Sequence, residues 1–150
     1  KKVRLIGANI PFWNRRWERV TKEDLRQDIE KIKEIGNTAR IFLVYGDAGL
    51  GYFGTTEVRK NLLDKLEYFV KEAQQQGIVV IVTPGVHNYF EVEPNKKFYQ
   101  QILQRLASYK NIIYDIQNEP DLEAQHIPSR RETIVGWCNS IAEFVKQNDP

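Results

Sequence analysis

The stretch that decides the fold class is Gly77-Ile78-Val79-Val80-Ile81-Val82-Thr83, in which five branched aliphatic residues stand between a glycine and a threonine. A strand that is apolar at every position can be buried on both faces, which is typical of parallel sheets. Upstream, residues 62–73 place apolar side chains at helical spacing, and a glycine commonly follows the end of a helix. The succession of helix, glycine and buried strand predicts an alternating α/β fold.

The same alternation occurs along the whole chain. Four strands are predicted, at residues 3–10, 38–45, 78–83 and 111–117, and an amphipathic stretch follows each of them. Such alternation is the pattern of βα units around a parallel sheet. We therefore expect four complete βα units.

The first helix has clear boundary signals. Thr21 and Asp24 have the spacing of a capping box, and Gly36 follows the last apolar turn. These signals predict a helix over about residues 22–35.

The later helices are marked less sharply. The third is expected to begin after Pro94-Asn95, and Ser129 with Glu132 predicts a capping box for the fourth. The apolar residues expected to face the sheet are Leu25, Ile29 and Ile32 in the first helix; Leu62, Leu66, Phe69, Val70 and Ala73 in the second; Phe98, Ile102 and Leu106 in the third; and Val135, Cys138, Ile141, Ala142 and Val145 in the fourth.

The spacing of the strands indicates the architecture. They follow one another at intervals of about 35 to 40 residues, the size of one βα unit of a TIM (β/α)8 barrel. A closed barrel typically needs about 250 residues, so 150 residues supply half of its strands. We predict an α/β fold that is half of a TIM (β/α)8 barrel, one domain of four βα units with a parallel sheet over residues 1–150. The alternative is an open, doubly wound sheet of the flavodoxin type, which differs in strand order.

Composition and charge exclude several classes of function. The 22 Lys and Arg residues balance the 20 Asp and Glu residues, so neither nucleic acid nor a membrane surface is expected as a partner. The longest apolar runs, residues 41–45 and 78–82, are too short to cross a bilayer. A single cysteine, Cys138, rules out an intramolecular disulfide, and two widely separated histidines favour no metal site. The glycines of residues 46–54 lack the pattern of a phosphate-binding loop.

Aromatic residues gather in the predicted loops after the strands. Their flat faces and polar edges suit the pyranose rings of sugars, which favours a carbohydrate-binding groove. The alternative is that they pack the loops onto the rim of the sheet. The eight residues concerned are Phe12, Trp13, Trp17, Tyr45, Tyr52, Phe53, Tyr89 and Phe90.

The fourth predicted strand ends in Asn118-Glu119-Pro120, which puts a carboxyl group at the rim of the sheet beside an amide. Both candidate folds bind ligands in the loops after strand ends. Partial burial against aromatic side chains would raise the pKa of Glu119 and suit it to donate a proton near neutral pH. Glu119 is therefore the best catalytic candidate in the sequence.

Arg40 and His87 are further candidates. Arg40 lies within an apolar strand, where a guanidinium group is costly unless it meets a carboxylate, so an acidic group is expected to face it. The alternative is a strand-end position in water or a structural pair with Asp115 or Asp47. His87, followed by Asn88, comes after the third strand, and a packed histidine without a catalytic role is the alternative there.

Together these residues resemble the retaining (β/α)8 glycoside hydrolases of clan A, closest in pattern to the cellulase- and mannanase-like family 5. Gly7-Ala8-Asn9-Ile10-Pro11-Phe12-Trp13 resembles the family's opening strand, which runs into an aromatic residue. Gly36-Asn37-Thr38-Ala39-Arg40-Ile41 resembles its second strand, and Asn118-Glu119-Pro120 resembles the end of its fourth. The resemblance covers the whole chain.

The resemblance implies roles for the matched residues. Glu119 would be the general acid/base, Asn118 would contact the sugar 2-hydroxyl group, and Arg40 would support the nucleophile. His87 resembles the third-strand histidine of the family, about two positions later. No metal or cofactor is implied. The residues expected to bind the substrate, a β-linked oligosaccharide or polysaccharide, are Trp13, His87, Asn88, Tyr45 and Tyr89.

The resemblance also implies that half of the catalytic pair is elsewhere. The nucleophile of the family is a second Glu at the end of the seventh strand, and this sequence stops before it. Retaining hydrolysis needs two carboxyl groups about 5 to 5.5 Å apart, so we expect the 150 residues alone to be inactive. The alternative function is a non-catalytic carbohydrate-binding or scaffold half-barrel.

A half-barrel leaves two strand edges and an apolar inner face uncovered, and such surfaces favour association. We expect a second copy, in a homodimer, or a missing C-terminal half-barrel to cover them. The lack of a starting methionine agrees with removal of an export signal, which favours an extracellular location, and equally with trimming.

Overall fold

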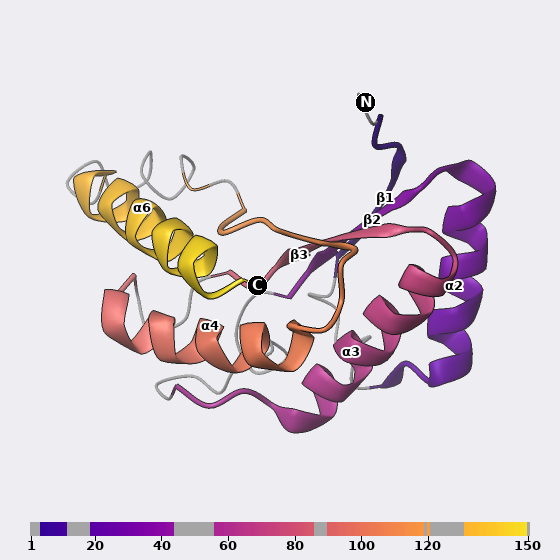
Figure 1. Ribbon diagram of the computed structural model, residues 1–150, viewed down its shortest axis with the longest axis horizontal. Coiled ribbons are helices and arrows are strands. Elements are labelled where there is room, and N and C mark those ends of the chain that lie inside the picture. Colours follow the sequence, from indigo (N-terminus) through magenta and orange to yellow (C-terminus); the bar gives the residue numbers. More distant parts are fainter. Residues whose placement is uncertain are drawn as a thin grey trace.

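The computed structural model describes residues 4–11, 19–43, 56–85, 90–118, 120 and 131–149. Strands and helices alternate throughout these residues (Figure 1). The strands are β1 (Gly7–Pro11), β2 (Thr38–Phe42), β3 (Val79–Thr83) and β4 (Ile112–Tyr114). The helices are α2 (Lys22–Ile35), α3 (Lys60–Gln75), α4 (Val92–Leu106) and α6 (Arg131–Asn148).

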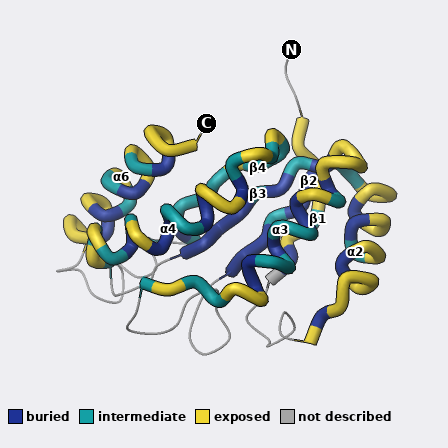
Figure 2. Tube along the Cα trace, turned by 60° about the horizontal axis from the view of Figure 1, so that its bottom comes forward, coloured by how far each residue is buried: buried dark blue, intermediate teal, exposed yellow. Residues whose placement is uncertain are grey.

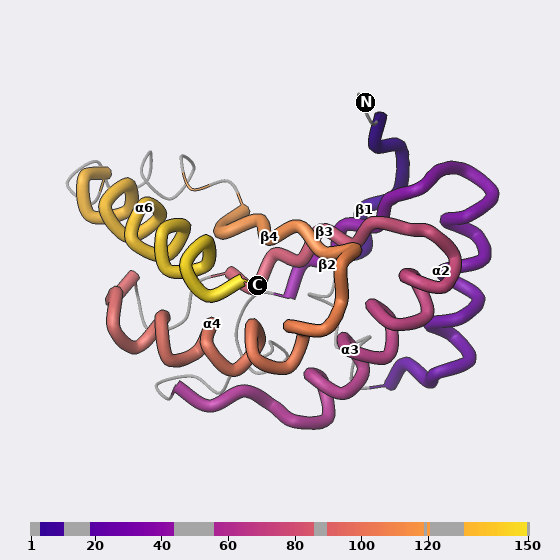
Figure 3. Tube along the Cα trace, in the orientation of Figure 1, coloured from indigo at the N-terminus to yellow at the C-terminus, as the bar shows by residue number. Residues whose placement is uncertain are grey.

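The four strands form one parallel sheet in the order β1-β2-β3-β4. The helices follow one another in an arc around one side of this sheet, a succession that is easily traced by colour in Figure 3. A doubly wound sheet reverses its strand order and places helices on both faces, whereas a barrel keeps sequential neighbours adjacent. The predicted half of a (β/α)8 barrel is confirmed, and the flavodoxin-type alternative is wrong.

The two faces of the sheet differ in burial. Side chains alternate between the faces of a strand, and Ala39, Ile41, Val80 and Val82 point toward the helices and are fully buried. In Figure 2 the buried residues, in dark blue, run along the strands and recur along the helices that cover them. The opposite, inner face carries one row of residues in register, Asn9, Arg40, Ile81 and Ile113. Ile113 in that row is 44% exposed, so the inner face is open.

The first helix has its predicted bounds, whereas the strand after it begins as predicted at Thr38 but ends at Phe42 and not at residue 45. Thr21 caps α2 through the predicted capping box with Asp24, and the helix ends at Ile35. Gly36 then passes so close to the segment before β1 that an added Cβ would lie 1.9 Å from the carbonyl oxygen of Ile6. Only glycine permits this approach.

The ends of β1 and β4 also differ from the prediction, and β3 begins one residue late, at Val79. β1 begins at Gly7 and not at residue 3, because the side chain of Asn37 bonds the backbone of Arg4 and Ile6 and the ladder with β2 starts beyond them. β4 has three residues in place of seven. Within the described residues, β4 pairs with β3 alone, and their ladder has three residue pairs.

The third helix begins earlier than expected. α4 starts at Val92, so Pro94 lies inside its first turn and not before it. The first-turn amides of a helix have no intrahelical partner, and proline, which lacks one, is tolerated there. The predicted inward residues of the third helix, as well as those of the first and second, are buried.

The inner face of the fourth helix was predicted partly wrongly. Ile134, Trp137, Ile141 and Val145 are buried, whereas Val135 is 52% exposed. Ala142 is also exposed, Cys138 is half-buried, and Ser129 lies outside the described residues. The helix offers two overlapping apolar stripes, and packing of α6 against α4 buries the one with Trp137, which removes more apolar area from water.

Candidate functional site

Arg40 connects three strands at the inner face of the sheet. It lies in the middle of β2, and its side chain is 26% exposed. The Nε atom donates to Oδ2 of Asp115 at 3.0 Å, and Nη2 contacts the same oxygen. Nη2 also donates to Oδ1 of Asn118 at 3.1 Å. Arg40 therefore reaches across β3 to the segment that follows β4.

Asp115 supplies the acidic group expected to face Arg40, in the structural pairing that the sequence offered as the alternative to a role in the site. It is the first residue after β4, and its backbone N–H donates to the carbonyl of Val82 at 2.9 Å. Its Oδ2 also accepts a 2.8 Å hydrogen bond from the hydroxyl of Thr83. The pair is about two-thirds buried, and charge-assisted bonds of this kind offset the loss of solvation. Of the two partners left open by the sequence, Asp115 is the one observed, and Asp47 lies outside the described residues.

Asn118 is oriented by the same guanidinium. Since Arg40 only donates, the amide oxygen of Asn118 must face it, and the position of the amide group is defined. Asn118 immediately precedes Glu119 in the sequence. The network thus fixes the segment from Asp115 to Asn118, next to the predicted general acid.

A fourth side chain reaches the same segment from the helix layer. Tyr99, on α4, is fully buried, and its hydroxyl lies 2.7 Å from the carbonyl oxygen of Ile116 and 3.1 Å from that of Gly85. Burial raises the pKa of Tyr99 well above its usual value, and the carboxylate of Asp115 adds to the shift. The hydroxyl therefore stays protonated and acts as a donor. The sequence pattern did not single out Tyr99. The one signal for it is that Tyr99 stands directly beside Phe98, which was predicted to face the sheet.

Most of the other predicted site residues lie outside the described residues. Phe90 is described, and its ring packs edge-to-face on Trp137 of α6 with 5.3 Å between centroids. For Phe90, packing of the loop onto the body of the protein is therefore the correct interpretation. The predicted site residues that lie outside the described ones are Glu119, Trp13, Tyr45, His87, Asn88 and Tyr89.

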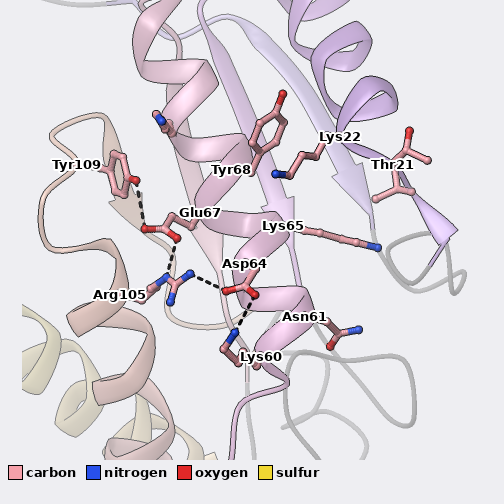
Figure 4. A pocket seen from close by; sticks show the side chains of 12 residues that line it. Thr21, Lys22, Lys60, Asn61, Asp64, Lys65, Glu67, Tyr68, Arg105 and Tyr109 are labelled. Atoms are coloured by element: carbon pink, nitrogen blue, oxygen red, sulfur yellow. Dashed lines mark hydrogen bonds and ion pairs between the residues drawn. The ribbon is translucent and has the colours of Figure 1, made fainter.

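A separate hollow of about 700 Å³ lies in the helix layer, between the start of α2, α3 and the end of α4 (Figure 4). Arg105 donates to Asp64 and Glu67 at 2.6 and 2.7 Å, and Lys60 pairs with Asp64 at 3.4 Å. The acidic groups of this hollow are thus engaged in ion pairs, which leaves no carboxylate poised for catalysis. It belongs to the outer surface, away from the strand-end network.

The described ranges carry neither a membrane-spanning helix nor a metal-binding cluster. No described helix combines the length and apolar character that a bilayer crossing requires. Among the same residues, no group of three or more His, Cys, Asp or Glu side chains has the arrangement of a metal site.

The fold and the network define a class of protein: a parallel (βα)4 half-barrel with a polar cluster where the strands end, the place where barrel enzymes keep their sites. Residues 1–150 match the cellulase family, glycosyl hydrolase family 5, over their whole length. The chain belongs to this family.

The relatives found by comparison are longer than this chain. Endoglucanase E-5 from Thermobifida fusca is 28% identical over 96 residues, which are 61% of this chain and 19% of that protein. The crystal structure of the catalytic domain of T. fusca endoglucanase Cel5A with cellotetraose superposes with a TM-score of 0.64 at 21% identity, over 99% of this chain and 46% of that one. The chain therefore spans less than half of either relative.

Two further solved structures share the fold. The exo-β-1,4-mannosidase Op5Man5 from Opitutaceae bacterium strain TAV5 has a TM-score of 0.72 at 15% identity, covering 96% of this chain and 30% of its own. The GH5_18 protein from Streptomyces cattleya, solved with GlcNAc, has a TM-score of 0.69 at 16% identity, covering 89% and 38%. At such identities the likeness concerns the fold alone.

Proposed function

We propose that these residues form the N-terminal half of the catalytic domain of a retaining β-glycan hydrolase and carry its general acid/base, Glu119. The observation that carries the proposal is the Arg40–Asp115–Asn118 network, which holds the segment leading into Glu119. Family membership supports hydrolysis of a glycosidic bond. The cellotetraose bound to the T. fusca domain supports a β-linked oligosaccharide as substrate.

In this proposal each residue has a distinct task. Glu119 protonates the oxygen of the leaving sugar, because a carboxylic acid at the rim can donate its proton as the bond breaks. Asn118 contacts the sugar 2-hydroxyl group, with its amide held by Arg40. The aromatic and polar residues of the rim that would bind the sugar rings are Trp13, Tyr45, His87, Asn88 and Tyr89.

The second carboxylate must come from outside this segment. Asp115 is the carboxylate within the network, but one of its oxygens accepts from Arg40 and Thr83 together. A carboxylate stabilised in this way is a poor nucleophile for the anomeric carbon. We therefore expect the nucleophile to reside on four further βα units that cover the open inner face.

The experiment measures two quantities on the 150-residue protein. Hydrolysis of an aryl β-cellobioside should be absent, because a lone acid cannot form the glycosyl-enzyme intermediate. Cellotetraose should still bind at the strand ends, measured by NMR titration, and Asn118→Ala should weaken that binding. A Lys71→Ala variant on the outer surface of α3 serves as the control.

Each result has a clear meaning. Aryl-cellobiosidase activity that Glu119→Gln abolishes would contradict the claim that the nucleophile is elsewhere. Absence of cellotetraose binding would contradict the proposed substrate site. A further test uses the protein joined to a C-terminal half-barrel. If that protein binds cellotetraose equally well with and without Glu119→Ala and hydrolyses nothing, a non-catalytic carbohydrate-binding half-barrel would be favoured.

A further inference from the structure

The segment from Asp115 to Asn118 is held from two directions. From the inner face, Arg40 and Thr83 bind its first residue, and Arg40 also binds its last. From the helix layer, Tyr99 reaches through the core to the carbonyl oxygen of Ile116. The contact from α4 is therefore independent of the charged network.

The Tyr99 contact lies where the sheet ends. The last backbone hydrogen bond of the β3–β4 ladder runs from the N–H of Asp115 to the carbonyl of Val82. Both strands end close to this bond. On the β3 side the chain leaves the sheet through Gly85, whose φ of 76° suits glycine. The hydroxyl of Tyr99 lies between two carbonyls beyond the ladder, those of Gly85 and Ile116. The Tyr99 hydroxyl therefore connects the segment after β3 with the segment after β4, close to where the backbone hydrogen bonds of the ladder end.

The chemistry of the phenol makes this connection specific. A tyrosine hydroxyl has one proton, so the two carbonyls share it, with the shorter bond to Ile116. Its ring is fully buried and packs edge-to-face on Phe98, which fixes the direction of the hydroxyl. A phenylalanine would preserve the packing and leave the buried carbonyl of Gly85 and the half-buried carbonyl of Ile116 without this donor.

We infer that Tyr99 is a positioning residue of the strand-end site, which acts through the backbone of Ile116 and Gly85 to place Asn118 for contact with the sugar. The inference rests on the proposed function for its consequence, and on the observed contacts for its geometry. It assigns to an outer helix a part in substrate binding that the sequence pattern does not show.

The test compares two variants of α4. Tyr99→Phe removes the hydroxyl alone, and Ile102→Val trims a fully buried residue of the same helix that packs in the same core. Both should lower the urea midpoint of unfolding. Only Tyr99→Phe should speed amide hydrogen exchange across residues 115–118, by about fivefold, the effect of one lost hydrogen bond. It should also weaken cellotetraose binding by a similar factor.

A second control separates loss of any tyrosine hydroxyl from loss of this one. Tyr109→Phe removes a hydroxyl that contacts Glu67 on the outer surface, and it should leave exchange at residues 115–118 unchanged. Equal exchange in the Tyr99→Phe and Ile102→Val proteins would overturn the positioning role. If the wild type fails to bind cellotetraose while the exchange pattern is as expected, the proposed function fails and the positioning role stands.

Discussion

Arg40 places a positive charge in the middle of a five-residue strand, between the buried Ala39 and Ile41. Its position is tolerated because Asp115, which is 75 residues away in the sequence, meets it with two contacts. The presence of an acidic partner followed from the cost of burying an unpaired guanidinium. The identity of that partner did not, because the sequence offered Asp47 and Asp115 equally.

At this scale we predict the effect of Asp115→Asn. The change keeps the size of the side chain but leaves Arg40 and Thr83 with a weaker acceptor, so the free energy of unfolding should fall by about 1–3 kcal/mol. Urea denaturation measures it. The matched control is Glu23→Gln, which removes the charge from an exposed pair with Arg26 and should cost less than about 1 kcal/mol. Equal losses in the two variants would show that the inner pair contributes no more than a surface pair.

Among the elements, those with local signals match their predictions best. The capping box of α2 and the glycine after it involve residues within one turn of each other, and α2 has the predicted bounds. The start of α4 and the buried face of α6 were predicted less well. A proline such as Pro94 can stand either just before a helix or in its first turn, so it does not define where α4 begins. The two apolar stripes of α6 are alike in the sequence, and only the segment packed against the helix decides which one is buried.

The junction between α2 and β2 gives the prediction at this scale. Gly36→Ala should lower the free energy of unfolding by about 1–3 kcal/mol, because its Cβ would overlap the backbone of Ile6 and the strand must shift. Gly136→Ala, on the exposed face of α6 with no atom within 4 Å of the added Cβ, should instead raise it by about 0.5–1 kcal/mol. Thermal and urea unfolding of both variants measure the contrast. A neutral Gly36→Ala would mean that the close approach is easily relaxed.

In the part of the chain that the structure describes, the sheet is covered by helices on one face, and the other face is open. The inner row ends in Ile113, an exposed apolar residue on the strand at the edge of the sheet. Exposed edges and apolar faces favour association with further strands. This asymmetry supports the proposal that further βα units or a second copy complete the barrel.

At the scale of the whole molecule we predict self-association of the 150-residue protein by itself. Light scattering coupled to size exclusion should give a dimer at micromolar concentration, and Ile113→Lys should shift it toward monomer by placing a charge on the inner face. Val135→Lys, at a residue of similar exposure on the helix side, should leave the dimer unchanged. A monodisperse monomer for the wild type, or equal effects of the two variants, would contradict an interface on the inner face.

The sequence by itself determined the four βα units, their succession along the chain and the kinds of side chain at the strand ends. Those features depend on periodicity, caps and glycines within a few residues of one another, which a linear pattern records. The tertiary structure alone decided that Asp115 pairs with Arg40, that Tyr99 bonds the carbonyl of Ile116, and that α6 buries Trp137 in place of Val135. The physical reason is that each of these depends on which distant segments meet and on how much surface they bury together, and neither quantity is written in local sequence.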